Sequence, residues 1–551
     1  MEGGRRVIQT GITDFKEIRE SNLIYVDKSE LISDILARRA ETFLFTRPRR
    51  FGKTLNLSML DCFFNLRYKG NHWFDGLKVM DDPHAVSVMN AFPVIRLDMK
   101  NLRIDSEETF ISDLRLNISK LYQSFDYLKD SKVQTPENIE VYMRGRSKMM
   151  DDSEMCDSLN LLLHMLNVHH GIKPIVLIDE YDGPLNNAFG KDSYEGILGF
   201  LRHFYSNTLK TNVDMRFAVV TGVMQIAKES IFSGLNNLEV NNIFSVECDE
   251  RFGFTPSEVE SLCEEYGDPD AFETAKEWYD GYRFGDAEIY NPWSVIKFIR
   301  ANFKADSYWA GTSGNDIIDT LVDHADSETY GHLLSMANGD EVRMSIDPLI
   351  TTNDLIDPKP YVICSVLAVS GYLNAVPEGD RYALSVPNRE MMSVFSTMMD
   401  RTIHSDAHDA FGNLFGGLEN GDEGRVRDGM QRILDKNIPF ILLTRESDYQ
   451  LIIGSAAMGR LGRYSIALEA KSGGGRADII MTPNSPGYPT IILELKRSKS
   501  FLPRSLKASA NDAIAQIKRK HYCRQMKGRV LLWGICFRSK EFETAFEEMT
   551  V

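Results

Sequence analysis

The chain has 551 residues, of which 43% are hydrophobic and 26% are charged, and its formal net charge at pH 7 is −16. This length is too great for one hydrophobic core, so about three domains are expected. No apolar run approaches the roughly 20 residues that cross a bilayer, and the N-terminus lacks the apolar core of a secretory signal. We therefore expect a cytoplasmic protein that does not enter a membrane. The seven scattered cysteines lack CxxC spacing, which argues against zinc and against a disulfide framework.

The first 250 residues alternate between strand and helix patterns. Short buried strands are predicted at 42–46, 91–98, 174–179 and 215–221, and helices at 52–64, 105–125, 153–170 and 194–210. The run PIVLID at 174–179 is continuously apolar, as in a strand that is buried on both faces of a parallel sheet. The alternation predicts an α/β doubly wound domain over residues 1–250.

Residues 251–430 are predicted to form a mostly helical, acidic lid or linker domain. Thr255 and Glu258 match a capping box, and Pro256 fits the first helical position. One hairpin is expected at 371–386, with PEGD at its turn. No chemistry is apparent in this region.

Residues 431–551 return to mixed structure with a predicted αβββαβ order. After a first helix, strands are expected near 464–470, 477–482 and 490–496, then a helix near 508–524 and a strand at 529–537. The Gly473–Gly475 triplet is interpreted as a turn between strands.

The segment YPTIILELKRS at 488–498 carries the most informative chemistry. Side chains alternate faces on a strand, so Glu494 and Lys496 point the same way while their neighbours point into a core. Asp478 lies on the strand before. Two carboxylates and an ammonium on neighbouring strands can hold a divalent metal and position a water, which is the equipment for cutting a phosphodiester. An acidic and basic pair on an exposed strand face is the alternative interpretation.

A second phosphate signal is the string RPRRFGKT at 47–54, which resembles the end of a Walker A loop. Gly52, Lys53 and Thr54 supply its Gly-Lys-Thr end between a strand and a helix, where backbone N–H groups, the lysine and the hydroxyl would hold phosphates and Mg²⁺. Arg47 replaces the first glycine of the pattern, and Arg49 and Arg50 add positive charge that could partly substitute for it. The alternative is a basic strand-to-helix turn.

The third predicted strand ends in a Walker B pattern, in which apolar residues precede two acids. Asp179 would hold magnesium and Glu180 would polarise the attacking water. Thr221, at the end of the next strand, could contact the γ-phosphate, or its hydroxyl could cap the following helix. A buried strand with an acidic end is the alternative for the whole pattern.

At this point the chain resembles a known family, the prokaryotic AAA-ATPase-like proteins, in which a divergent P-loop domain precedes a PD-(D/E)XK nuclease-superfamily domain. The resemblance rests on FTRPRRFGKTLNLSMLDCFF, VLIDEYDGPL, AKESIFSGLNNL, WYDGYRFG and YNPWS, and it covers nearly all of the chain. It implies ATP binding through Lys53 and Thr54, with Asp179 and Glu180 as the Walker B pair. It leaves open whether ATP is hydrolysed. No chemical role for IFSGLNN or WYDGY can be derived from the sequence.

The resemblance also implies a nuclease signature in residues 431–551. Its members would be Glu446, Asp478, Glu494, Lys496 and Gln516. Asp478, Glu494 and the carbonyl of Leu495 would hold Mg²⁺. Lys496 would orient or deprotonate the nucleophile, Gln516 would orient Lys496 or the phosphate, and Glu446 could complete the metal shell or act through water.

The charge pattern near this signature favours a nucleic-acid partner. Between Lys496 and Arg529 there are eleven Lys or Arg residues and one acid, Asp512. Such a surface could neutralise phosphates, with DNA as the expected substrate, although a basic solvated helix face is the alternative.

The sequence thus predicts an ATP-binding, AAA-like NTPase module that controls a Mg²⁺-dependent nuclease. One alternative is a nucleotide-switched scaffold that binds nucleic acid or protein through an inactive nuclease fold. Another is an NTPase that remodels a protein partner. A homo-oligomer is compatible with the resemblance, because AAA relatives often form rings.

Overall fold

The computed structural model describes residues 6–224, 238–309, 318, 321–322, 325, 327–337, 339–350, 354–355, 358–395, 408–435, 449–450, 453–454, 457, 460, 463–472, 475–498, 503–524, 526–538 and 541–551. The chain forms two compact units. One comprises Met1–Thr320 and Met344–Met391, and the other comprises Leu321–Arg343 and Met392–Val551.

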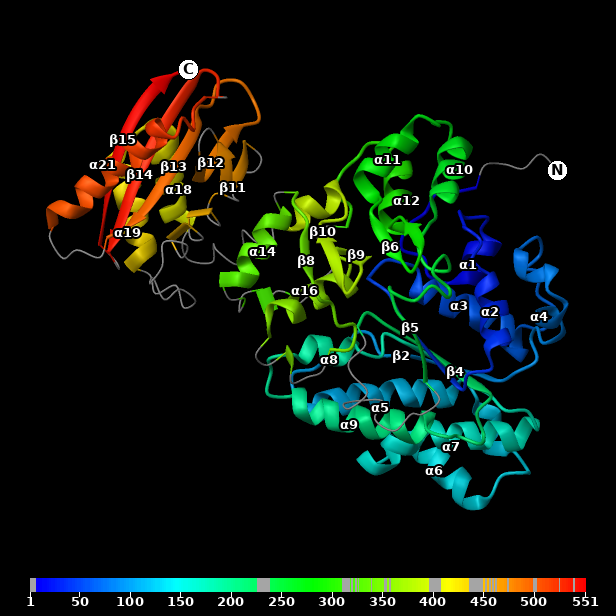
Figure 1. Cartoon of the computed structure of the whole chain (residues 1–551). Coiled ribbons are helices and arrows are strands. Elements are labelled where there is room, and N and C mark those ends of the chain that lie inside the picture. Colours follow the sequence, from blue (N-terminus) through cyan, green and yellow to red (C-terminus); the bar gives the residue numbers. More distant parts are fainter. Residues whose placement is uncertain are drawn as a thin grey trace. The chain divides into compact units, whose positions relative to one another are not determined.

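The first unit is built on a five-stranded parallel sheet (Figure 1). Its strands are β1 (Thr42–Thr46), β2 (Val94–Asp98), β3 (Ile175–Asp179), β4 (Phe217–Gly222) and β5 (Leu238–Asn241). Their order is β2-β3-β4-β1-β5. Every residue of β1, β3 and β4 is buried, as expected for parallel strands that are covered on both faces. In this order β1, which precedes RPRRFGKT, and β3, which ends at Asp179, lie on either side of β4.

Helices cover both faces of this sheet, which confirms the predicted α/β architecture with a parallel sheet. One face packs against α5 (Glu107–Gln123), α7 (Asp152–His170) and α9 (Tyr194–Leu209), and the other against α3 (Lys53–Phe64). Ile95, Val176 and Val220 point from the strands into the core of the first face. The smaller elements around the sheet are α1 (Phe15–Glu20), α2 (Glu30–Arg38), η1 (Leu66–Tyr68), η2 (Lys78–Asp81), α4 (Pro83–Ser87), η3 (Asp126–Asp130), α6 (Pro136–Arg146) and α8 (Gly183–Ala188).

The remainder of the first unit is helical with short hairpins. Its elements are α10 (Pro256–Tyr266), α11 (Ala271–Tyr279), β6 (Tyr282–Phe284), β7 (Ala287–Ile289), α12 (Pro292–Arg300), α16 (Pro360–Val369), β9 (Asn374–Glu378) and β10 (Arg381–Ser385). The short strand β8 (Val342–Met344) lies between the two parts of this unit in the sequence. The capping box of Thr255 and Glu258 is confirmed at the start of α10. The predicted hairpin is also confirmed, because β9 and β10 pair antiparallel around Gly379, whose φ is +65°.

The second unit contains a mixed five-stranded sheet of order β11-β12-β13-β14-β15. Its elements are α14 (Ser327–Ala337), α18 (His408–Asn420), α19 (Glu423–Asp435), β11 (Tyr464–Ser472), β12 (Gly475–Pro483), β13 (Thr490–Arg497), α21 (Pro503–Arg519), β14 (Arg529–Arg538) and β15 (Glu541–Thr550). The strands β13 and β14 pair in parallel, and the other neighbouring strands pair antiparallel.

Each face of the second sheet has its own core. Ile491, Leu493 and Leu495 pack with α18 and α19, as the alternation predicted. Ile492 packs on the opposite face with residues of α21, such as Ile514. The α21 face is therefore the one that receives the even-numbered side chains of β13.

The last strand, β15, is absent from the predicted αβββαβ order. It pairs antiparallel with β14 along its whole length and forms one edge of the sheet. Its sequence, EFETAFEEMT, mixes glutamates with apolar residues and shows little strict alternation. Charged side chains are common on edge strands, where they oppose pairing with other chains. The glutamates, which obscure the alternation by which a strand is predicted, are thus typical of a strand at the edge of a sheet.

Candidate functional site

The loop between β1 and α3 presents the start of a helix at the carboxyl end of the sheet. Gly52 is the N-cap of α3 and adopts a φ of +83°, which is the left-handed region that favours glycine. No side chain caps this helix. Within the described part of the chain, no atom lies within 4 Å of the place that a Cβ on Gly52 would occupy. The first-turn N–H groups of α3, including that of Thr54, have no acceptor within the helix.

Lys53 lies folded back onto this loop. Its side chain is 6% exposed, and its Nζ donates hydrogen bonds of 2.8 Å to the carbonyls of Arg47 and Pro48. Burial lowers the pKa of Lys53 to about 8, and the nearby carboxylate of Glu180 opposes this shift. An ammonium held by carbonyl oxygens at a helix N-terminus can exchange them for phosphate oxygens.

Arg47, at the position of the missing glycine, points away from the loop into the protein. Its guanidinium is fully buried and donates to the carbonyls of Thr46 and Asn241 and to the Oδ1 of Asn241, at 2.9, 3.0 and 2.5 Å. It also lies about 5 Å from the ring centres of Phe252 and Phe284. Sequence reasoning treated this arginine only as the replacement of the missing glycine, whereas in the structure its hydrogen bonds join the end of β1 to β5.

The other two arginines of the loop differ from Arg47. Arg50 adopts a φ of +73°, and its guanidinium lies 4.1 Å from the ring centre of Trp293, in the string YNPWS. Arg49 is half-buried and close enough to Lys53 to lower its pKa further. The neighbouring Phe51 packs against the rings of Tyr282, the last residue of WYDGY, and of Phe284. These strings therefore help to hold the loop in place.

The predicted acids gather beside this loop. Asp179, at the end of β3, is 2% exposed, and the hydroxyl of Thr221 donates to its Oδ1 at 2.6 Å. Glu180 follows with a φ of +50°, an uncommon conformation for a residue other than glycine. Burial raises the pKa of Glu180, while the charges of Lys53 and Lys100 oppose that shift. The structure thus brings the Walker A-like and Walker B-like residues to one edge of the sheet.

Asp182 is a residue of this site that sequence reasoning missed. It is 1% exposed, and its Oδ2 accepts hydrogen bonds from the backbone N–H groups of Val223 and Met224 at 3.0 and 2.9 Å. A Cβ on Gly222 would lie 2.6 Å from the Oδ1 of Asp182 and 2.5 Å from the ring of Tyr181. The third acid in the string DEYD could have signalled this anchor, which joins the ends of β3 and β4.

The second candidate site lies in the second unit, where β12 and β13 meet α21. Asp478 and Glu494 stand opposite one another on the strands, next to the ladder that pairs Ile479 with Leu493. The Nζ of Lys496 lies 3.1 Å from the Oε1 of Glu494. All three side chains belong to the α21 face of the sheet, because they occupy even-numbered positions on their strands.

Glu494 is the most constrained member of this cluster. It is 1% exposed, and its Oε1 also accepts a hydrogen bond from the side-chain amide of Gln516 on α21. Its Oε2 is buried and has no hydrogen-bond partner among the described residues. Burial raises the pKa of Glu494 to about 7, Asp478 adds to the rise, and Lys496 opposes it. A buried carboxylate oxygen without a donor is what a bound cation would satisfy.

The backbone of Leu495 points toward Asp478 on β12. Its N–H donates to the Oδ2 of Asp478 at 2.6 Å. N–H and C=O groups of one strand residue point to the same neighbouring strand, so the Leu495 carbonyl is also directed toward the β12 side. Glu446 lies outside the described residues. Within the residues that are described, no cluster of three or more His, Cys, Asp or Glu residues could hold a metal.

Two family models match separate parts of the chain. Residues 9–232 match the family of predicted AAA-ATPases, and residues 444–547 match the PD-(D/E)XK nuclease superfamily. These matches follow the order of the two regions that the sequence resemblance implied. The chain is also 27% identical over 398 residues to a protein of Azotobacter chroococcum mcd 1 described as an uncharacterized protein in the vnfD 5′ region. That alignment covers 70% of this chain and 68% of the relative.

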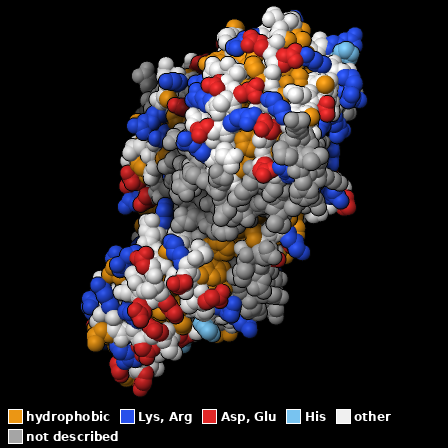
Figure 2. Space-filling model, turned by 90° about the vertical axis from the view of Figure 1, so that its left-hand side faces the viewer, with side chains coloured by type: hydrophobic (Ala, Val, Ile, Leu, Met, Phe, Trp, Pro, Cys, Tyr) orange, Lys and Arg blue, Asp and Glu red, His pale blue; other side chains and the backbone are white. Residues whose placement is uncertain are grey.

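The basic stretch of the nuclease-superfamily domain is partly neutralised by glutamates of β15 and α19. Lys518 pairs with Glu547, and Arg529 pairs with Glu548. Lys507 lies 3.5 Å from Glu423. On the face of the molecule that Figure 2 shows, Lys and Arg side chains are interspersed with Asp and Glu. Counting cations along the sequence therefore overstates the positive field of this domain.

Three cations at the end of α21 differ from these paired residues. Arg519, Lys520 and Arg524 are exposed and form no ion pair within 4.0 Å with any described residue. Arg519 and Lys520 follow Gln516 by three and four residues, so they lie on the same side of the helix turn. None of the described helices offers an apolar stretch of the length that a bilayer requires.

Proposed function

We propose that this protein is an ATP-binding, Mg²⁺-dependent nuclease that hydrolyses phosphodiester bonds in DNA. The observation that carries the proposal is the arrangement around Glu494. One of its carboxylate oxygens is held by Lys496 and Gln516, while the other is buried without a partner among the described residues. Asp478 stands opposite on the neighbouring strand. Burying this much uncompensated charge has a cost that a cation would remove.

The donors present fit magnesium. The carboxylates of Asp478 and Glu494 and the carbonyl of Leu495 are all oxygen ligands, which suit Mg²⁺ better than softer metals. When bound, a divalent cation lowers the pKa of a coordinated water and neutralises charge on the phosphate. Glu446 is proposed to complete the metal shell or to act through water.

Lys496 and Gln516 have separate roles in this proposal. Lys496 shares the α21 face with both carboxylates, so its ammonium can orient the attacking water and offset charge on the phosphate. To deprotonate that water, Lys496 would have to be in its neutral amine form. Gln516 donates to Glu494 and so fixes the orientation of the carboxylate beside Lys496. Arg519, Lys520 and Arg524 would contact the flanking phosphates.

The nucleotide arm of the proposal rests on the edge of the first sheet. Lys53 and Thr54 would contact the phosphates, together with the N–H groups at the start of α3 and the nearby charge of Arg49 and Arg50. Asp179 would hold the magnesium that accompanies the nucleotide, and Glu180 would polarise water if the nucleotide is hydrolysed. Thr221 already donates to Asp179, so it would set the orientation of that carboxylate. The state of this site is proposed to gate the nuclease domain.

A binding function without cleavage is the second candidate. The neutralisation of Lys507, Lys518 and Arg529 by glutamates favours the form of this candidate that binds protein, because fewer cations remain to hold nucleic-acid phosphates. In that case the nuclease fold would act as a nucleotide-switched scaffold for nucleic acid or protein. Protein-stimulated ATP hydrolysis that DNA does not stimulate would instead indicate remodelling of a protein partner.

The experiment incubates purified full-length protein with end-labelled single- and double-stranded DNA and RNA, with and without Mg²⁺ and ATP. We expect cleavage of DNA that requires Mg²⁺. Lys53→Ala should abolish ATP binding and any effect of ATP on cleavage, while the exposed control Lys69→Ala should behave as the wild type. Binding of DNA without cleavage under every condition would refute the nuclease. Cleavage that is equal with and without ATP would refute the gating alone.

A further inference from the structure

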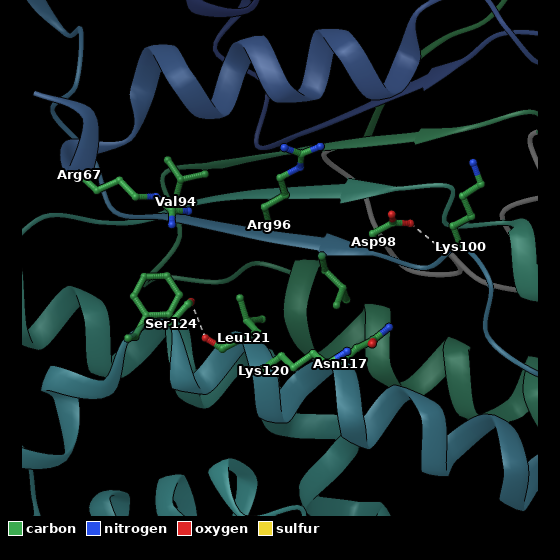
Figure 3. A pocket seen from close by; sticks show the side chains of 11 residues that line it. Arg67, Val94, Arg96, Asp98, Lys100, Asn117, Lys120, Leu121 and Ser124 are labelled. Atoms are coloured by element: carbon green, nitrogen blue, oxygen red, sulfur yellow. Dashed lines mark hydrogen bonds between the residues drawn. The ribbon is translucent and has the colours of Figure 1, made fainter. Parts of the chain in front are cut away.

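A cavity of about 410 Å³ lies along the outer edge of β2 (Figure 3). Arg96 lines it from the strand, Arg67 from the start of η1 and Lys100 from the loop after the strand. Lys120 lines it from α5, and Asp98 is its single carboxylate. The cavity is therefore a cationic groove in a protein whose net charge is −16.

The hydrogen bonds of β2 show which of its backbone groups face this groove. The carbonyl of Pro93 accepts a hydrogen bond from the N–H of Ile175, and the N–H of Met99 donates one to the carbonyl of Asp179. The odd-numbered residues of β2 therefore form their backbone hydrogen bonds with β3. In a parallel ladder, alternate residues point to opposite neighbours. The N–H and C=O groups of Val94, Arg96 and Asp98 therefore point outward. The sheet order places β2 at the edge, with no strand beyond it among the described residues.

The outer edge of β2 is already used just before the groove begins. The N–H of Phe92 donates to the carbonyl of Phe64 at 3.0 Å, and its carbonyl accepts from the N–H of Leu66 at 2.8 Å. These bonds form a parallel bridge between Asn65 and Phe92. The chain then turns into η1 and leaves the edge. The chain itself thus pairs with the outer edge through one bridge, and this pairing ends where the cationic groove begins.

The cations of the groove are available to a ligand. Within the described part of the chain, Arg96, Lys100 and Lys120 form no ion pair within 4.0 Å, and the side chains of Lys100 and Lys120 are exposed. Arg67 has a long contact of 3.8 Å with Asp61 and remains 49% exposed. Figure 3 shows Arg67, Arg96 and Lys100 spaced along the strand, with Lys120 on the helix below it.

We propose that this groove binds an extended acidic segment of a partner protein, which adds to β2 as a sixth strand. An edge strand offers donors and acceptors in alternation, and another polypeptide backbone complements both. A nucleic acid would satisfy the cations and the N–H groups, but its phosphates could not donate to the outward carbonyls of Val94 and Arg96. The span from Val94 to Lys100 is about 20 Å, which is room for about six extended residues.

The test measures fluorescence anisotropy of full-length protein with a labelled peptide of about ten residues that alternates glutamate with threonine. A peptide with lysine in place of glutamate is the control ligand. Lys120→Glu should weaken binding of the acidic peptide by about fivefold, the scale of one exposed charge pair. Lys132→Glu, an exposed cation outside the groove, should leave binding unchanged. The lysine peptide should not bind.

The contribution of the backbone is tested by comparing two substitutions at one site. Arg96→Gln removes the charge and keeps the outward N–H, whereas Arg96→Pro removes both without breaking a bond to β3. Strand addition predicts that Arg96→Pro weakens binding by about fivefold more than Arg96→Gln, the scale of one hydrogen bond. Circular dichroism checks that both variants fold.

A second measurement does not depend on the folding of any variant. Two N-methylated versions of the acidic peptide are compared. One carries N-methyl groups on its odd-numbered residues, and the other carries them on its even-numbered residues. Only one set of N–H groups faces β2 in an added strand, so one methylated peptide should bind far more weakly than the other. The proposal is overturned by absence of acidic-peptide binding, by equal losses for the two methylated peptides, or by an oligothymidylate that displaces the peptide and binds more tightly. It is independent of the proposed nuclease activity.

Discussion

Replacing Arg47 with glycine makes the loop agree better with the Walker A pattern, yet the structure predicts that Arg47→Gly damages the protein. The substitution removes three hydrogen bonds of 3.0 Å or less to Thr46 and Asn241. At about 1–2 kcal/mol each, the three bonds contribute about 3–6 kcal/mol. Loss of the buried stem and of the contacts with Phe252 and Phe284 adds about 2 kcal/mol.

The charge of Arg47 offsets part of this stabilisation. Burial lowers the pKa of its guanidinium from 12.5 to about 10, which corresponds to a cost of about 3 kcal/mol for holding the charge inside the protein. The net loss for Arg47→Gly is therefore about 3 kcal/mol or more. Nucleotide affinity should fall as well, because the side chain joins the loop to β5.

The assay is urea unfolding of the full-length protein followed by circular dichroism, with binding of a fluorescent ATP analogue measured on the same samples. Arg50→Gly is the matched control. It loses the contact with Trp293 but places glycine at a φ of +73°, so its stability should stay within about 1 kcal/mol of the wild type. An Arg47→Gly protein that is as stable as the wild type, or that binds the analogue more tightly, would refute the reasoning.

Two further predictions concern buried residues of the first unit. Glu390 is fully buried and accepts from Ser294 and from the backbone of Trp309, and burial raises its pKa from 4.5 to about 7. The folded state then holds more protons than the unfolded state between these pH values, so Glu390 reduces stability by up to about 3 kcal/mol as pH rises through them. Glu390→Gln should reduce the dependence of the melting temperature on pH over this range. The same dependence in the variant and in the wild type would contradict the raised pKa of Glu390. Gly222→Ala should cost about 2 kcal/mol in urea unfolding because its Cβ would meet Tyr181 and Asp182, whereas Gly199→Ala in α9, where no described atom is near, should cost nothing.

Much of the fold could be predicted because its signals are local. The strand at 42–46 matches β1 residue for residue, since a short apolar run between polar ends has few other interpretations. The capping box at Thr255 could be predicted for the same reason, because Glu258, which completes it, is only three residues away. The grouping of Asp478, Glu494 and Lys496 on one face follows from strand alternation and from the pairing of neighbouring strands.

Features that depend on distant residues could not be predicted. The role of Arg47 depends on Asn241, which lies nearly two hundred positions away in the chain. The neutralisation of Lys518 depends on Glu547 of β15, a strand that the pattern did not reveal. The free edge of β2 follows from the strand order, which no local pattern contains. In each case a tertiary contact, and not a propensity, decides the outcome.

The most direct test of the proposed nuclease is the rate of Mg²⁺-dependent DNA cleavage by Lys496→Gln compared with Lys527→Gln. Lys496 lies within 3.1 Å of Glu494, whereas Lys527 is an exposed cation of the same basic stretch that is assigned no part in the reaction. The proposal predicts a loss of about 100-fold or more for Lys496→Gln, with DNA binding retained, and a wild-type rate for Lys527→Gln. Equal cleavage by the two variants would contradict it.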